Sequence, residues 1–324
     1  MSITPQLKLA QPQKIARESD ALALFSLFVA LAAVSFAAIF MRFSEVEIGA
    51  SATVFNRFWI FAVIFGGGKA IAASRNRWVN PQPIVKAPLD LRHGFLLLAV
   101  GIIATTSLVL WAMSLTFTTV ANSVLLNNLT PIFASLGGWL FLSQRFDRRF
   151  ISGTAVALAG AVALGIDDFQ VADGSLYGDA LALLSAVFLA AYFLLVEQLR
   201  DRFDATAILL CRCAIGAVLL FPLILSTGES LFPTTISGWL AVIGLGAICE
   251  GTGQRLLVNS LDRFSSSFVC LFLLLEPLCS ALLAWMIFAE ALSVTDGIAF
   301  AVVLGGIYIA KSSKAAMKAV GESA

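Results

Sequence analysis

Two stretches of this chain are copies of each other. The segment LTPIFASLGGWLFLSQRF (129–146) returns as LEPLCSALLAWMIFAEAL (275–292), and Pro131 corresponds to Pro277. Each copy is a long apolar segment with a proline near its start, followed by a polar break and a second apolar segment. An internal repeat of this length indicates a duplicated fold, so any fold assigned to the chain has to contain two related halves.

The composition of the chain is that of a membrane protein. Of its 324 residues 59% are apolar and 13% are charged, and the mean hydropathy is +0.92, whereas soluble domains carry about 25% charged residues. The apolar residues form runs of roughly 17–25, the length that an α-helix needs to cross about 30 Å of hydrocarbon. These runs are too long and too continuous for the strands of a membrane barrel. The sequence therefore predicts an all-α polytopic membrane protein.

Ten segments have the length and composition of membrane spans. They lie at about 21–41, 50–68, 94–115, 119–142, 150–166, 178–197, 205–226, 236–258, 265–289 and 295–311. They divide the chain into a tail (1–19), a first five-helix repeat (20–168), a second five-helix repeat (169–311) and a second tail (312–324).

Lysine and arginine residues are distributed unequally between the loops. With the N-terminus inside, the loops on the outer side hold Arg42 alone among basic residues, and nearly all the others outside the spans fall on the inner side. Cytoplasmic loops carry such an excess of positive charge. The sequence thus predicts a multi-pass protein of the cell's inner (plasma) membrane with both termini in the cytoplasm.

The two halves are expected to lie in opposite orientations. DALALFS (20–26) at the start of the first span returns as DALALLS (179–185) at the start of the sixth, so each half holds five spans. Because five is an odd number, the second half enters the membrane from the other side. Inverted repeats are a common transporter architecture, and their substrate site lies near the midplane between the halves.

The residues at the end of the fourth and ninth spans follow one pattern. Its members are Leu129-Thr130-Pro131 with Gln144, and Leu275-Glu276-Pro277 with Glu290. Arg57 and Arg212 in the second and seventh spans also correspond, as do the glycine-rich final spans of the halves. Over residues 20–311 these features resemble the drug/metabolite transporter superfamily, specifically its EamA-type members.

The resemblance implies a secondary transporter that works by alternating access. Its expected activity is the export of a small metabolite, an amino acid or a drug, by facilitated or proton-coupled transport, without a catalytic residue set. One departure is that Gln144 stands where the family usually has an acid, whereas Glu290 keeps the acid. The chain has no phosphate-binding GxxxxGK[ST] loop, so it is not expected to hydrolyse ATP or to need a cofactor.

Charged residues inside a span are costly and are treated first as functional candidates. Glu250 and Gln254 are one turn apart on the eighth span and form a polar stripe, so we expect them to line a substrate pathway. Arg57 and Arg212 have two interpretations. They either hold an anionic substrate or anchor helices structurally, and their symmetric placement favours the structural role.

Glu276 precedes Pro277, which removes a backbone donor and disturbs the helix beside the carboxyl group. A carboxyl group in such a place can carry a proton, so Glu276 is the candidate for coupling. Its counterpart Thr130 cannot titrate. The alternative interpretation of Glu276 is a capping carboxylate near the end of its span.

Four further residues are candidates for the substrate pathway. Asn127 and Thr130 form a polar strip on the fourth span, Trp111 lies on the third, and Tyr192 lies near the centre of the sixth. Hydrogen bonding between helices is the other interpretation of the polar strip.

Two rival functions remain open from the sequence, an intramembrane enzyme acting on a lipid-linked substrate and a non-transporting membrane scaffold. Five cysteines within apolar runs and a single His93 indicate neither a disulfide framework nor a metal site. A net charge of +1 indicates no nucleic-acid partner. The expected partners are a small-molecule substrate and membrane lipid, and the sequence leaves open whether protons or a second copy in a homodimer take part.

Overall fold

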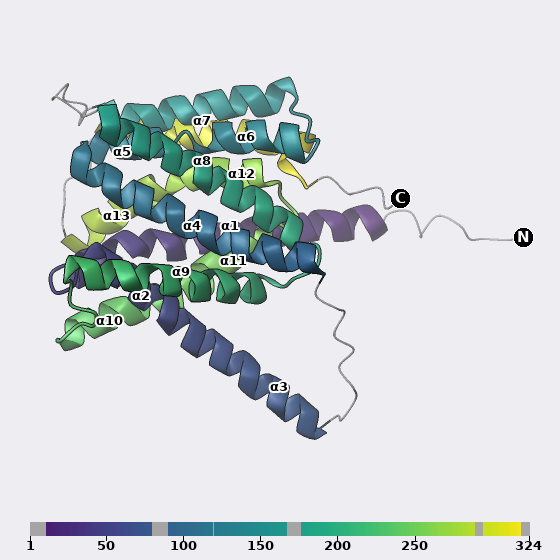
Figure 1. The fold of residues 1–324 in the computed structure, drawn as a ribbon. Coiled ribbons are helices and arrows are strands. Elements are labelled where there is room, and N and C mark those ends of the chain that lie inside the picture. The colour runs from purple at the N-terminus through teal and green to yellow at the C-terminus, as the bar shows by residue number, and fades with distance from the viewer. Residues whose placement is uncertain (1–10, 80–89, 119, 167–175, 289–293, 319–324) are drawn as a thin grey trace, which may run out of the picture.

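The computed structural model describes residues 11–79, 90–118, 120–166, 176–288 and 294–318, and these residues form a bundle of helices (Figure 1). Within them, eight helical segments are long and apolar enough to cross a membrane, and the apolar helix Gly297–Lys311 is shorter.

The helices of the first half follow the predicted spans. Its elements are α1 (Gln11–Ser44), α2 (Ala50–Phe61), the π-helical segment η1 (Ala62–Gly66), α3 (Gly67–Val79), α4 (Leu91–Phe117), α5 (Val120–Asn127), α6 (Thr130–Phe141) and α7 (Arg148–Ile166). The second span comprises α2, η1 and α3, and the fourth comprises α5 and α6.

The helices of the second half repeat this order. Its elements are α8 (Leu176–Leu199), α9 (Ala205–Thr227), α10 (Ile236–Gly244), the π-helical segment η2 (Leu245–Gln254), α11 (Arg255–Ser260), α12 (Ser266–Phe272), the 3-10 turn η3 (Leu273–Leu275), α13 (Glu276–Phe288), α14 (Val294–Lys311) and the 3-10 turn η4 (Lys314–Ala316). The eighth span comprises α10, η2 and α11, and the ninth comprises α12, η3 and α13.

The packing of the helices follows the duplication. The third span packs on the sixth (α4 on α8), and the equivalent pair, the eighth and the first, also packs together (η2, α10 and α11 on α1). The fourth and sixth spans (α6 and α8) are matched by the ninth and first (α13 and α1). The prediction of an all-α membrane protein with about ten helices in two inverted five-helix repeats is confirmed.

Both copies of the opening repeat are broken helices. In the first copy α5 ends at Asn127 and α6 begins at Thr130, with Pro131 in its first turn. In the second copy the break is the 3-10 turn η3, followed at once by Glu276 and Pro277. A proline has no N–H to continue the backbone ladder, which explains why the regular α-helix is interrupted at the same place in both copies of the repeat.

Two boundaries differ from the sequence prediction. The first helix begins at Gln11, inside the segment predicted as a tail, and the second span continues as α3 to Val79 instead of ending near residue 68. Gly67 keeps right-handed helical backbone angles, because glycine weakens a helix without ending it. In Figure 1, α3 therefore projects away from the rest of the bundle.

The last helices of the two halves, α7 and α14, are packed backbone to backbone. A Cβ atom at Gly306 would lie 2.3 Å from the backbone N of Ala157, and one at Gly153 would lie 2.5 Å from the backbone N of Ala310. Small residues four apart allow such close approach of membrane helices. This contact joins the last helix of the first half to the last helix of the second.

The α7–α14 contact can be tested with adjacent glycines. Gly306→Ala should lower the free energy of unfolding by about 1–3 kcal/mol, because the new methyl group overpacks a rigid backbone contact. Gly305→Ala is the matched control, since its Cβ would meet no heavy atom within 4 Å. It should be neutral or stabilising by up to about 1 kcal/mol through helix propensity. Chemical denaturation in detergent measures both, and equal effects would contradict the assignment.

Candidate functional site

A cavity of about 420 Å³ lies between the two halves. Its wall is built from α1, α2, α4, α8, α9 and η2, together with the broken fourth and ninth spans, and it includes no residue of α7 or α14 among those described. The site thus lies where the inverted repeats face each other, which is the position that this architecture uses for substrates.

Equivalent positions in both copies of the opening repeat line this cavity. Pairs of lining residues separated by 146 positions, as Pro131 is from Pro277, are Val124 and Cys270, Asn127 and Leu273, Asn128 and Leu274, Thr130 and Glu276, and Pro131 and Pro277. The duplication therefore builds the two walls, and the chemistry that differs between the walls comes from substitutions within these pairs.

The pair of Thr130 and Glu276 carries the largest chemical difference. The Thr130 hydroxyl donates to the carbonyl of Asn127 at 2.6 Å, within its own span. Among the described residues, Glu276 has no hydrogen-bond or ion-pair partner. Arg57 is near enough to act on it through charge, but no N–O distance between the two falls within 4.0 Å. Glu276 is therefore a carboxyl group that faces the cavity without a bound cation.

The second feature of the site is a buried ion cluster. Glu250 is fully buried, and its carboxylate accepts from Arg57 Nε at 2.8 Å and from Arg212 Nη1 at 2.9 Å. The three side chains come from α2, α9 and η2, and the two arginines are the equivalent residues of the two halves. If all three are ionised, the cluster carries one net positive charge.

Arg212 is also enclosed by two aromatic rings. Its guanidinium carbon lies 5.4 Å from the ring centre of Phe58 and 5.1 Å from that of Tyr192. Its Nη1 donates to the Tyr192 hydroxyl at 3.4 Å. A cation between aromatic faces is stabilised by their quadrupoles, so Arg212 is held in place at the cavity wall, which Arg57 and Tyr192 line as well.

The structure divides the residues predicted for the site into two groups. Gln254, Asn127, Thr130, Trp111, Tyr192, Glu276, Arg57 and Arg212 line one cavity. Glu250 lies behind the wall, enclosed by the arginines, rather than facing the pathway as the polar stripe on its span suggests. Glu290 lies outside the described residues.

Four polar atoms of the cavity residues are buried without a partner in the described chain. They are the indole Nε1 of Trp111, the Nε of Arg212, the Oδ1 of Asn127 and the Oε1 of Gln254. Buried polar groups normally find a hydrogen-bond partner. These atoms are therefore available to a ligand, and two of the four accept rather than donate.

One buried carboxylate was missed in the sequence. Glu197, near the end of α8, is 4% exposed and lies outside the cavity. In the sequence Glu197 lies at the end of the sixth predicted span, three residues before Arg200. An acid in this position can be either exposed or buried, so the local sequence did not identify it as a buried group.

Fold and site together define a membrane transport protein built from inverted repeats around a central cavity. The sequence model of the EamA-like transporter family matches residues 21–166 and 176–311, one match in each half. The chain belongs to this family.

Comparison with individual proteins is consistent with that membership. The chain is 25% identical over 206 residues to the pseudopaline exporter CntI of Pseudomonas aeruginosa (strain UCBPP-PA14), covering 63% of this chain and 71% of that protein. It is 22% identical over 204 residues to an uncharacterized transporter of Archaeoglobus fulgidus, covering 61% and 68%. A solved crystal structure aligns with a TM-score of 0.73 at 21% identity, over 90% of this chain and 97% of that one.

The ion cluster predicts a strong dependence of stability on Glu250. Glu250→Gln should lower the free energy of unfolding by about 3–5 kcal/mol, because it leaves the buried Arg212 and the partly buried Arg57 without their counter-charge. Glu276→Gln is the matched control, since it removes a carboxyl group with no bound partner and should change stability little. Denaturation of both variants in the same detergent measures the difference, and a harmless Glu250→Gln would show that the arginines are held by other contacts.

Proposed function

We propose that this protein is a secondary transporter that exports a small organic metabolite across the inner (plasma) membrane by alternating access. The observation that carries the proposal is the cavity between the halves, which is lined in part by equivalent residues of the two repeats. If helices of the two halves rock about this cavity, it opens to one side of the membrane and then to the other. Export as the direction is supported by the name of the Pseudomonas relative.

The charges around the cavity favour a zwitterionic substrate. With all three groups ionised, the cluster of Arg57, Arg212 and Glu250 carries one net positive charge, and Glu276, when ionised, adds one negative charge that is not bonded to it. In the described chain Arg57 uses only its Nε in hydrogen bonding, so its remaining N–H groups can bind a carboxylate. A metabolite with a carboxylate for Arg57 and an ammonium group for Glu276 satisfies both. Asn127 and Gln254 add acceptors for the ammonium group.

Glu276 is also the proposed coupling residue. An ionisable group in a cavity can bind either a proton or a cationic group of the substrate, but not both, and this competition links the movement of one to that of the other. Glu276 suits that role because no arginine or lysine of the described chain is bonded to it. Its counterpart Thr130 has no charge to exchange, so coupling depends on the second repeat alone.

The end of the bundle where α1 begins and α14 ends, hereafter the tail end, is proposed to face the cytoplasm. The support is the distribution of basic residues, which concentrate at this end and in the tails. With this orientation both termini are cytoplasmic and the substrate enters from the tail end.

Transport is tested with purified protein in liposomes. Counterflow of radiolabelled L-leucine and the other neutral amino acids should exceed that of empty liposomes. Two derivatives serve as matched competitors, L-leucinamide without the carboxylate and N-acetyl-L-leucine without the ammonium group. We expect the zwitterion to compete at least about tenfold better than either, the ratio for a lost interaction of about 1.4 kcal/mol. Absence of flux across a broad metabolite panel would reject the transport function, and equal competition by the three compounds would reject the zwitterion.

Coupling is tested with Glu276→Gln in the same liposomes. For the wild-type protein we expect flux to increase when a pH gradient drives protons against the substrate, and for the variant we expect flux that does not respond to the gradient. Glu45→Gln, in the exposed turn between α1 and α2, controls for a carboxyl group outside the cavity. A variant that folds and keeps the wild-type response to pH would exclude Glu276 as the coupling site.

A further inference from the structure

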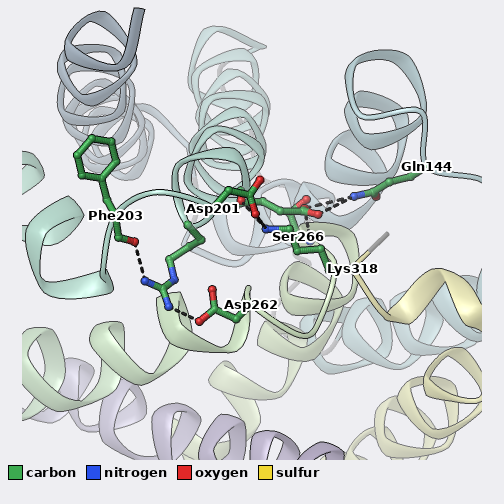
Figure 2. A network of polar contacts seen from close by, with 8 residues as sticks. Gln144, Asp201, Phe203, Asp262, Ser266 and Lys318 are labelled. Atoms are coloured by element: carbon green, nitrogen blue, oxygen red, sulfur yellow. Dashed lines mark hydrogen bonds and ion pairs between the residues drawn. The ribbon is translucent and has the colours of Figure 1, made fainter. Parts of the chain in front are cut away.

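The buried carboxylate of Glu197 joins three elements at the tail end of the bundle, and Figure 2 shows its partners Gln144 and Ser266 together with Lys318. Gln144 Nε2 donates to its two oxygens at 3.1 and 3.2 Å, and the backbone N–H of Ser266 donates to one of them at 2.7 Å. Ser266 is the first residue of α12, where backbone N–H groups have no helical acceptor. Hydrogen bonds to an ionised group are about twice as strong as those between neutral groups.

This network crosses the boundary between the two repeats. Gln144 follows α6 in the first repeat, whereas Glu197 and Ser267 belong to the second. The Ser267 hydroxyl donates to Gln144 Oε1 at 3.2 Å, so the amide of Gln144 is held at both of its ends. The fourth span is thereby joined to the sixth and ninth spans at the tail end.

The segment after α14 packs over the same end. The backbone N–H and the hydroxyl of Ser265 donate to the carbonyls of Ala316 and Ala315 at 3.0 and 2.7 Å. The ammonium group of Lys318 donates to the backbone carbonyl of Glu197 at 3.0 Å and to Asp201 at 2.7 Å. Residues that the sequence placed in a tail therefore form a strap, Ser313–Lys318, across the ends of α8 and α12.

The repeat shows that this end of the pathway is closed. On α1 the positions Ala38 and Met41 line the cavity. Their equivalents on α8, 159 positions later as Asp179 is from Asp20, are Glu197 and Arg200. Glu197 is buried in the network, and Arg200 is paired with Asp262 in the loop between α11 and α12. The residues that would line an opening at the tail end are thus occupied by contacts between elements.

We propose that Glu197, Gln144 and the strap Ser313–Lys318 form a latch that holds the tail end closed and has to release before the cavity can open on that side. The inference goes beyond the proposed transport function, since it concerns which contacts keep the cavity closed at the tail end. None of the residues proposed to bind the substrate belongs to the latch.

The physical chemistry of the latch allows it to release reversibly. Opening breaks the hydrogen bonds to Glu197, but it also brings this carboxylate and the amide of Gln144 into contact with water. A hydrated carboxylate recovers most of what the broken bonds contributed, because net hydrogen-bond contributions are small compared with the cost of leaving a buried charge unpaired. The closed state is therefore favoured only while the network stays complete.

Distance measurements between spin labels test the latch. Arg145, after α6, and Arg263, between α11 and α12, are exposed. Arg145 belongs to the first repeat and Arg263 to the second, so their separation reports movement between the repeats at this end. Labelled cysteines replace both in a background without the native cysteines. In lipid nanodiscs without substrate, Glu197→Gln and Lys318→Ala should each shift the distribution to longer distances. We expect about a tenfold rise in the ratio of open to closed protein, as for one lost hydrogen bond to a charged group.

Lys314→Ala is the matched control for Lys318→Ala, because Lys314 lies in the same strap but is exposed and has no side-chain bond in the described chain. Its distance distribution should equal that of the wild type. If Glu197→Gln does not fold, removal of all residues after Ser312 gives the same readout. Unchanged distributions in Lys318→Ala and in the shortened chain would overturn the latch.

The experiment needs no transport activity, so its result is independent of the proposed function. A longer distance in a protein that moves no substrate would support the latch and reject transport. Normal flux with unchanged distances would reject the latch and leave transport in place.

Discussion

The arrangement of this protein depends on one buried carboxylate shared by two arginines. Glu250 receives Arg57 from the first repeat and Arg212 from the second, so a single side chain fixes α2, α9 and η2 relative to each other. Few other placements would tolerate two guanidinium groups inside an apolar bundle, since an unpaired buried charge is far more costly than a lost contact. The cluster lies at the cavity wall, where Glu276 is a carboxyl group that is bonded to neither arginine.

Duplication explains the shape of the site, and departures from duplication explain its chemistry. Proline breaks at equivalent places give two similar walls, while Thr130 differs from Glu276 and Leu108 from its equivalent Gln254. A symmetric site would present the same groups to both ends of a ligand. The first copy supplies Asn127, Asn128 and Thr130 where the second has Leu273, Leu274 and Glu276, so the two copies present different groups to the cavity.

Much of the fold could be predicted from the sequence because hydrocarbon thickness sets the length of each span, and an odd number of spans per half dictates inversion. The ion cluster could not be predicted in the same way. Arg57 and Glu250 are 193 residues apart, and nothing in their local sequence says which arginine meets which acid. Glu197 was missed because a carboxylate near a span end is usually exposed, and only the packing of α6 and α12 on α8 buries it. The continuation of the second span as α3 was not predicted, because the glycines and basic residues of this stretch give it the composition of a loop.

The contact between α7 and α14 has a consequence for movement. Helices whose backbones touch at glycines on both sides cannot slide or tilt against each other without collision, and neither helix contributes a described residue to the cavity. This pair is therefore suited to be the stationary frame of the molecule. The remaining spans of each repeat would then move relative to this pair. The fixed part of the molecule would thus be the contact between the two repeats themselves.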